Sequence, residues 1–361
     1  MNRRLFLQTA AAAALSRPAA AANTGFLKLG YDTYSLRAFR WKALQHLDFA
    51  AAQKLDTIQL SGLGDYESLD PAYLQKVKDA ATRHGISIDA GIGCICPTTK
   101  SWNPKTGDPV EYIRTGLRVA KAVGAASMRC FIGSSADRLG PLPIDAHIEK
   151  TVEVLRAARS YAAGAGVKIA IENHSDLQAR ELKALIEEAG KDYVAVCLDT
   201  GNPMSVVEDP VVTMEVLGPY TVTTHVRDSV VYEHPRGAAM QWTAVGDGIL
   251  DFKRILELHR RLCPAASMQL EIITGRPPRV LPYLESEFWA AFPKTNAAEF
   301  ARFVALAKRG RPFAGMMIIA DAGTKVPPEY QAALKQQQMV DLERSLEYCR
   351  KTLDAGIRWR T

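Results

Sequence analysis

The sequence predicts an α/β protein of the (β/α)8 TIM-barrel class with a helical extension at its C-terminal end. Short apolar or β-branched runs alternate with longer amphipathic stretches after residue 24, which is the pattern of parallel strands joined by helices. Eight such runs are present, as a closed barrel requires. No GxGxxG motif follows the first run, so an open dinucleotide-binding sheet is disfavoured.

The expected strands lie at residues 27–34, 57–60, 86–90, 127–132, 167–172, 193–199, 220–226 and 268–272. Helical periodicity fills stretches between them, at residues 44–54, 73–84, 109–123, 144–163, 178–189 and 252–262. Four of these helices are followed by a glycine, which is a common residue at helix C-termini: Gly85, Gly124, Gly166 and Gly190. We therefore assign residues 25–275 to one barrel domain.

The pattern changes beyond residue 275. Three prolines, at positions 277, 278 and 282, interrupt regular structure, and an aromatic cluster follows at residues 288–292. A long helix-like run then extends over residues 328–353. We expect residues 276–361 to form a helical extension that packs on the barrel and that can also serve as a contact in a homo-oligomer.

The first 22 residues have the features of an export signal. Arg3 and Arg4 precede a mild, Ala-rich apolar stretch, and three alanines at 20–22 offer a cleavage site. The apolar stretch is too short to span a bilayer. We expect residues 1–22 to be a twin-arginine signal peptide and the mature protein to be periplasmic or secreted. A basic amphipathic N-terminal helix is the alternative.

The overall composition is that of a soluble globular protein, with 47% hydrophobic and 23% charged residues. Removal of residues 1–22 would take away three arginines and no acidic residue, which lowers the formal net charge from +6 to about +3. No dense Lys/Arg cluster is present, so nucleic acid is not an expected partner.

Four consecutive expected strands deliver a metal-binding side chain at or near their C-terminal ends. These side chains are Glu172, Asp199, His225 and Glu271. A barrel brings the C-terminal ends of its strands around one mouth. Two Glu, one Asp and one His form a mixed oxygen and nitrogen set suited to one Mn²⁺, Mg²⁺, Co²⁺ or Zn²⁺ ion. Any single acidic residue of this kind can instead cap a turn or helix, as at Asp199, but four in succession favour a metal site.

These residues also suit proton-transfer chemistry. With the imidazole neutral, the four side chains and a divalent ion sum to one negative charge. The ion would polarise a substrate carbonyl and stabilise the charge of an enediolate. Glu172 and Glu271, on opposite walls, are the candidate catalytic residues that remove and return a proton.

Four motifs carry a family resemblance. They are Glu-Asn-His at 172–174, Leu-Asp-Thr-Gly-Asn at 198–202, His-Val-Arg-Asp at 225–228 and Gly-Asp-Gly-Ile-Leu-Asp-Phe at 246–252. Together they resemble the xylose isomerase-like TIM-barrel superfamily, and within it the sugar phosphate isomerase/epimerase group that includes tagatose 3-epimerase-like enzymes, hydroxypyruvate isomerase and inosose dehydratase. The resemblance implies that the same two Glu, Asp and His bind the metal and that the two Glu move protons.

The chain also departs from the pattern of that group. Asn202 stands where the group usually has a substrate-contacting His, and Val231 stands where several epimerases have an Arg. His174 and Arg227 are candidates to compensate. Further substrate-binding candidates are Asp228, expected with Arg227 at the rim, and Trp102, in the loop after the third strand. We expect the Gly-Asp-Gly turn at 246–248 to be mobile and to close one side of the mouth.

The sequence therefore predicts a metal-dependent isomerase or epimerase that acts on a keto sugar or related polyol. A lyase or dehydratase acting on a keto sugar, inosose or oxidised glycoside would use the same site, because loss of a β-substituent from the same enediolate gives elimination. A non-catalytic carbohydrate-binding barrel is a third hypothesis, which the complete ligand set disfavours. A DNA-repair endonuclease of this superfamily would need additional histidine ligands and a basic face.

The export signal is directly testable. Residues 1–30 fused to a reporter should cross the bacterial inner membrane by the twin-arginine route only, and Arg3→Lys combined with Arg4→Lys should block transport. Reporter fractionation in strains with and without that translocase measures the outcome. Transport that persists without the translocase, or a native protein retained in the cytoplasm, would contradict the assignment.

Overall fold

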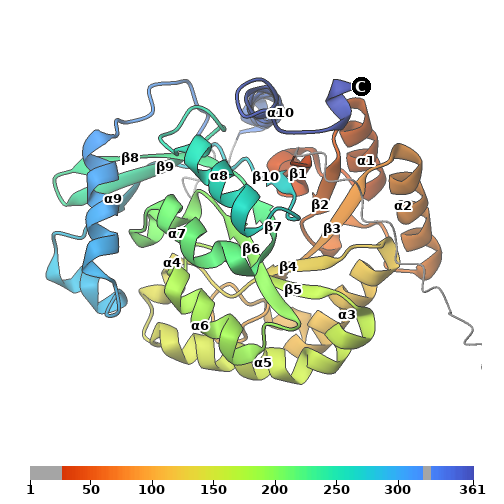
Figure 1. Ribbon diagram of the computed structural model, residues 1–361, viewed down its shortest axis with the longest axis horizontal. Coiled ribbons are helices and arrows are strands. Elements are labelled where there is room, and N and C mark those ends of the chain that lie inside the picture. The colour runs from red at the N-terminus through yellow and green to blue at the C-terminus, as the bar shows by residue number, and fades with distance from the viewer. Residues whose placement is uncertain (1–26, 320–326) are drawn as a thin grey trace, which may run out of the picture.

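The structure is a computed structural model that describes residues 27–319 and 327–361. The predicted twin-arginine segment lies outside these residues. Eight parallel strands form a barrel surrounded by helices (Figure 1). Helix α10 (Pro328–Lys351) lies beside the barrel, and a small second sheet stands at one side of it. The predicted TIM-barrel class is therefore correct. Among the described helices, none has the length and apolar character needed to cross a lipid bilayer.

The barrel strands are β1 (Leu29–Asp32), β2 (Thr57–Leu60), β3 (Ser87–Cys94), β4 (Ser127–Phe131), β5 (Lys168–Glu172), β6 (Val194–Asp199), β7 (Thr221–His225) and β10 (Met268–Leu270). Neighbouring strands pair in the order β10-β1-β2-β3-β4-β5-β6-β7. Between β7 and β10 the closure is made by Val226, whose N–H donates to the Gln269 carbonyl over 2.7 Å and whose carbonyl accepts from Glu271 N–H over 3.1 Å. The segment that carries Glu271, after β10, is thus hydrogen-bonded directly to the end of β7, which carries His225.

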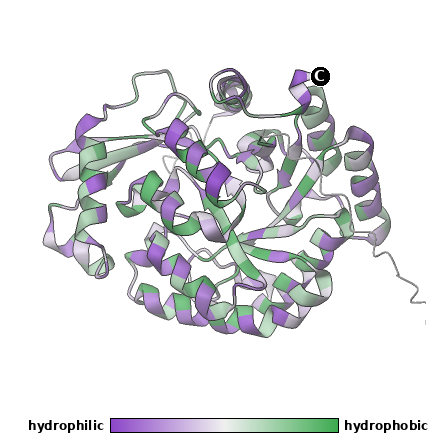
Figure 2. Ribbon diagram, viewed as in Figure 1, coloured by the Kyte–Doolittle hydropathy of each residue, from purple (hydrophilic) through white to green (hydrophobic). Residues whose placement is uncertain are grey.

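The barrel helices are α1 (Ala43–Ala52), α2 (Pro71–His84), α3 (Pro109–Val123), α4 (Ser135–Arg138), α5 (Ile144–Ala165), α6 (Ala179–Ala189), α7 (Pro210–Leu217) and α8 (Phe252–Leu262). Figure 2 shows hydrophilic and hydrophobic residues alternating along helices such as α5 and α6, as expected for helices buried on one side only. Local sequence explains their ends. In α3, the Asp108 carboxylate accepts from two N–H groups of the first turn, and Gly124 ends the helix at φ 81°.

A three-stranded antiparallel sheet stands beside the barrel. It consists of β8 (Asp228–His234), β9 (Gly237–Thr243) and β11 (Arg279–Leu281), in the order β11-β9-β8. One face of it packs under α9 (Ala297–Arg309) in a second hydrophobic core that includes Val231, Met240 and Phe303. The C-terminal extension also contributes one strand to this sheet, because β11 pairs with a hairpin that leaves the barrel after β7.

The remaining helix of the extension, α10 (Pro328–Lys351), matches the predicted helical run. Its buried residues Leu342, Leu346 and Cys349 belong to the main core. The chain end is then held by Asp56, whose carboxylate accepts from the N–H groups of Ile357 and Arg358 over 2.9 Å each. The extension is therefore packed on the barrel as expected.

The junction between α9 and the small sheet leaves no room for a side chain at Gly310. A Cβ atom there would lie 1.6 Å from the carbonyl oxygen of Val231, although the backbone angles at Gly310 suit any residue. Gly310→Ala should therefore lower the free energy of unfolding by about 1–3 kcal/mol.

Gly164→Ala is the matched control. Gly164 lies within α5, and a Cβ atom there would meet nothing within 4 Å. The helix propensity of Ala should make this variant more stable by up to about 1 kcal/mol. Urea denaturation of both variants measures the contrast, and equal effects would contradict the packing at Gly310.

Candidate metal centre and active-site pocket

The ends of four neighbouring barrel strands meet at one point. Glu172, Asp199 and His225 are the last residues of β5, β6 and β7, and Glu271 directly follows β10. All four side chains are buried, and each offers a ligand atom such that these atoms lie within 4.8 Å of one another. The strand-end pattern in the sequence thus corresponds to a compact cluster in space.

His225 is central to this cluster. Its Nδ1 lies 3.3 Å from Glu172 Oε2 and 3.3 Å from Glu271 Oε2. On the other side of the ring, Nε2 lies 2.5 Å from Gln59 Oε1 and 3.5 Å from Asp32 Oδ2. The imidazole is therefore oriented by residues at the ends of β1 and β2, and its Nδ1 faces the two glutamates.

Asp199 has both of the roles considered from the sequence. Its Oδ1 accepts hydrogen bonds from the N–H groups of Gly201 and Asn202, over 2.8 and 2.7 Å, and so fixes the turn after β6. Its Oδ2 contacts the guanidinium of Arg227. One carboxylate thus caps the turn and contributes to the cluster.

Two arginines enter the cluster from within the barrel. Arg129 Nε donates to Glu172 Oε2 over 2.6 Å. Arg227 Nη2 forms ion pairs with Asp199 and Glu271. Arg227 is only 2% exposed, so it does not form an ion pair at the rim, whereas its place in the pocket lining leaves contact with substrate hydroxyls, the other expectation, open. A buried cluster of carboxylates requires such compensation, because an unpaired buried charge is costly.

These neighbours set the ionisation of the cluster. Burial raises the pKa of Asp199 to about 6, even though Arg227 opposes the shift. Burial acts in the same direction on Glu271, but Arg227 and His225 outweigh it and lower the pKa of Glu271 to about 2. Burial would lower the pKa of His225, but the carboxylates of Glu271 and Glu172 help to raise it well above its ordinary value. His225 is therefore protonated at neutral pH when no metal is bound.

The charges and the donor set fit a divalent cation. Asp32, Glu172, Asp199 and Glu271 supply four carboxylates within the contact network, and Arg129 and Arg227 supply two positive charges. With the imidazole neutral, two net negative charges are left, which one divalent ion would balance. Among the described residues, no hydrogen-bond partner meets His225 Nδ1, although it is fully buried. An ion bound here would share Asp199 and Glu271 with Arg227.

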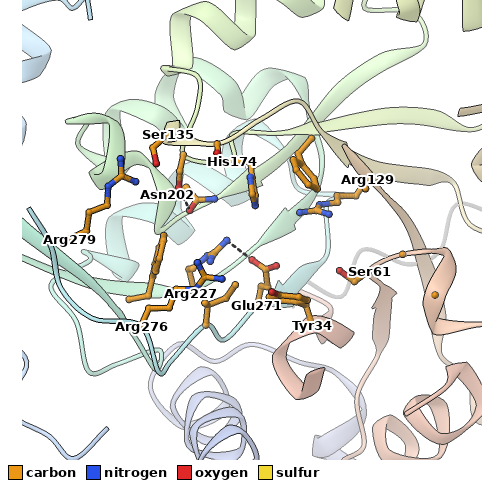
Figure 3. A pocket seen from close by; sticks show the side chains of 18 of the residues that line it. Tyr34, Ser61, Arg129, Ser135, His174, Asn202, Arg227, Glu271, Arg276 and Arg279 are labelled. Atoms are coloured by element: carbon orange, nitrogen blue, oxygen red, sulfur yellow. Dashed lines mark hydrogen bonds and ion pairs between the residues drawn. The ribbon is translucent and has the colours of Figure 1, made fainter. Parts of the chain in front are cut away.

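A pocket of about 880 Å³ opens above this cluster. Glu271 and Arg227 line its floor, whereas Glu172 and Asp199 do not reach the pocket wall. Tyr34, Ser61 and Arg129 lie at one end of it, and Arg279 and Ser135 lie at the other (Figure 3). Glu271 is thus the carboxylate of the cluster that a pocket ligand would contact.

Two further predicted substrate-binding residues line the pocket. His174 is positioned by a 2.8 Å contact of Nδ1 with the Gly133 carbonyl and by packing on Phe131. Asn202 Nδ2 donates to Glu172 Oε1 over 3.2 Å, so this amide connects the pocket wall to the cluster.

Trp102 and Asp228 have a different placement, and within the described residues neither belongs to the pocket wall. Trp102 packs edge-on to Tyr112. The buried Asp228 carboxylate accepts from the N–H groups of Gly246, Gly248 and Leu250. It therefore holds the Gly-Asp-Gly turn in place, and the expectation that this turn closes freely over the mouth gains no support.

Comparison with known proteins agrees with the barrel fold. A model of the xylose isomerase-like TIM-barrel family matches residues 47–274. The chain belongs to this family.

Three relatives show the range of proteins to which the chain is similar. It is 22% identical over 250 residues to 3-oxo-isoapionate decarboxylase from Pectobacterium atrosepticum, covering 66% of this chain and 82% of that protein. The structure of 3-keto-D-glucoside 4-epimerase from Escherichia coli aligns with a TM-score of 0.54 at 16% identity, covering 75% of this chain and 100% of the epimerase. The structure of the IOLI protein with a bound zinc atom aligns with a TM-score of 0.53 at 12% identity, covering 78% and 95%. The named enzymes among these relatives act on sugars or sugar-derived compounds.

Several residues of the candidate site were not predicted from the sequence. Asp32 and Gln59 stand at strand ends, so the rule that located the four ligands also applies to them. Trp242, Arg276 and Arg279 line the pocket from the small sheet or the segment next to it. The pairing of β11 with β9 holds Arg279 opposite Met240, and the pairing of β8 with β9 holds Trp242 opposite Ser229.

The protonation of His225 gives a prediction about metal binding. Because the pKa of His225 is raised, binding of Mn²⁺ or Zn²⁺ at pH 7.5 should release about one proton, and the Kd should weaken about tenfold for each pH unit below that. Below pH 6 the slope should steepen, because Asp199, with a pKa of about 6, then also carries a proton. Titration calorimetry in buffers of different ionisation enthalpy counts the protons.

Asp199→Ala should abolish this metal binding while the barrel stays folded. His84→Gln, on α2 outside the cluster, should leave both the affinity and the proton count unchanged. Tight binding without proton release at pH 7.5 would contradict the assignment of His225 as a ligand that is protonated in the free protein.

Proposed function

We propose that this protein is a metal-dependent isomerase or epimerase that moves a proton at a carbon next to the carbonyl of a keto sugar or related polyol. The single observation that carries the proposal is the position of Glu271. This carboxylate is ionised, belongs to the four-residue cluster and lines the pocket floor. A base held at the floor of a sugar-sized pocket is what abstraction of a carbon-bound proton requires.

The surrounding residues have distinct roles in this proposal. Glu172, Asp199, His225 and Glu271 would hold one divalent ion, which as a Lewis acid would polarise the substrate carbonyl. Arg227 fixes the orientation of Glu271 through their ion pair and keeps it ionised. Glu271 would then accept the proton from one carbon and return it to the neighbouring carbon, which completes an isomerisation. An epimerisation would need a second group, the role predicted for Glu172, to protonate the opposite face.

Substrate hydroxyl groups would be bound by the polar side chains of the pocket wall. His174 and Asn202 lie beside the cluster, and Tyr34 provides a partly exposed aromatic face at the other end of the pocket. Glu172 is fully buried and bonded to Arg129 and Asn202. This burial favours Glu172 as a ligand and gives Glu271 the main part in proton transfer.

A lyase is the second candidate. Its first step is the same proton abstraction, or another cleavage that leaves the same type of enolate. The similarity to a decarboxylase favours keeping this candidate, since decarboxylation next to a ketone also yields an enolate. The outcome depends on whether the enolate is reprotonated or loses a group.

The site would act on a sugar outside the cytoplasm, because residues 1–22 have the features of a twin-arginine signal. Phosphorylated sugars are scarce there, so the proposed substrate is unphosphorylated.

Hydrogen exchange tests the proposed function. The metal-loaded protein incubated in D₂O with a panel of keto sugars should place deuterium on a carbon next to the carbonyl, as followed by NMR. Glu271→Gln should slow this exchange by about a hundredfold or more, because an amide cannot accept the proton. Glu257→Gln, exposed on α8, is the matched control and should exchange normally.

The products separate the candidates. Deuterium on an intact carbon skeleton supports an isomerase or epimerase, and deuterium accompanied by loss of a hydroxyl, aglycone or carboxyl group supports a lyase. The absence of exchange with every keto sugar in a fully metallated protein would overturn both and favour a carbohydrate-binding barrel.

A further inference from the structure

The pocket has two chemically different regions. Its floor contains the cluster around Glu271, where each arginine is ion-paired to a carboxylate. At the opposite end from Tyr34 and Ser61 lies Arg279, whose side chain extends toward Ser135 (Figure 3). The second region has no part in the proton transfer proposed above.

Arg279 differs from the arginines of the floor in its partners. It is the first residue of β11, and its backbone is held by the pairing of that strand with Met240 on β9. Its side chain is partly buried, and among residues 27–319 and 327–361 no carboxylate forms an ion pair with it. Burial without a compensating anion lowers the pKa of Arg279. A guanidinium in this situation gains by binding an anion from solution.

Ser135 adds a hydroxyl donor next to Arg279 at this end of the pocket (Figure 3). Ser134 and Ser175 also line the pocket, but their hydroxyl groups already donate to Asp137 Oδ2 over 3.1 Å and to Asn202 Oδ1 over 2.9 Å. A smaller cavity behind Arg279 is closed by Phe288 and Phe292, which exclude water on that side. Of the carboxylates on the pocket wall, Glu271 belongs to the floor, and Asp65 accepts from the N–H of Gly62, next to Ser61 at the opposite end.

We propose that the substrate is a keto sugar acid whose carboxylate is bound by Arg279 and Ser135 while its carbonyl, at the other end of the molecule, faces Glu271. This inference rests on the proposed function and names its substrate class. A single guanidinium presents two parallel N–H groups that match a planar carboxylate. The Ser135 hydroxyl adds a third donor on the same side.

The selectivity can be measured as binding, without turnover. In titration calorimetry on the metal-loaded Glu271→Gln protein, 5-keto-D-gluconate, whose carbonyl is remote from its carboxylate, is compared with D-fructose, a neutral six-carbon ketose, and with D-fructose 6-phosphate. The acid should bind about tenfold or more tightly than fructose. Addition of Arg279→Gln should remove this preference and leave the Kd for fructose unchanged.

Two further variants make the comparison specific. Arg279→Lys keeps the charge but loses the paired N–H groups, so the acid should bind with intermediate affinity. Arg261→Gln, exposed on α8 and remote from the pocket, removes the same charge and should change nothing. Melting temperatures confirm that each variant is folded.

The inference is overturned if 5-keto-D-gluconate binds no more tightly than fructose, if Arg279→Gln leaves its affinity unchanged, or if fructose 6-phosphate depends on Arg279 more strongly than the acid does. Failure of the proposed function gives a different result. In that case the wild-type protein exchanges deuterium into neither the acid nor fructose, whatever their affinities. Exchange into fructose with no preference for the acid would uphold the function and reject the substrate class.

Discussion

The structure depends on the burial of negative charge at the mouth of the barrel. Parallel strands that end together bring Glu172, Asp199 and Glu271 into one small volume from which water is largely excluded. Like charges at such distances repel strongly in a medium of low dielectric constant. The fold can contain this cluster because two arginine side chains form ion pairs with its carboxylates. Arg129 comes from β4, and Arg227 is the second residue after the end of β7. The remaining negative charge is one that a divalent ion could balance.

This compensation also separates the two glutamates. Glu172 is enclosed by Arg129, Asn202 and His225, whereas Glu271 has its ion pair with Arg227 on one side and the pocket on the other. Two residues of the same type, at equivalent ends of two strands, therefore differ in what they can contact. Glu271, which lines the pocket, is placed to meet a ligand there, whereas Glu172, which does not line the pocket, contacts only other residues of the protein.

The small antiparallel sheet shapes the pocket above the cluster. It leaves the barrel directly after the cluster, at Asp228, and returns as β9 and β11 to form one wall of the pocket. The chemistry then depends on the barrel strands, and the choice of ligand depends on the wall. This division is compatible with the comparisons, in which a protein of 22% identity is named as a decarboxylase and one of 16% identity as an epimerase. Changes in the wall alter what faces Glu271 without disturbing the strand ends.

Much of this organisation could be predicted from the sequence. The period of the apolar runs predicted the eight barrel strands, because strand and helix periodicities are local properties of the chain. The cluster was also predictable, since barrel closure forces every strand end to the same mouth and the four ligands stand at those ends. Asp32 and Gln59 were not predicted. The first strand was expected to run to residue 34, so Asp32 did not stand at its expected end, and Gln59 has an amide side chain, which is not a usual metal ligand.

Other features were decided by tertiary structure alone. The sequence places Arg227 two residues after His225, but nothing local indicates whether its side chain turns to solvent or inward. The buried charge of Asp199 and Glu271 draws it inward. The pairing of Arg279 with Met240 joins residues from segments separated by the whole of α8 and β10. Such pairing depends on the hydrophobic face that α9 covers, and that face exists only once the hairpin has formed. The sequence alone thus determined the barrel and its ligands, whereas the pocket wall and the charge compensation followed from contacts between segments that are distant along the chain.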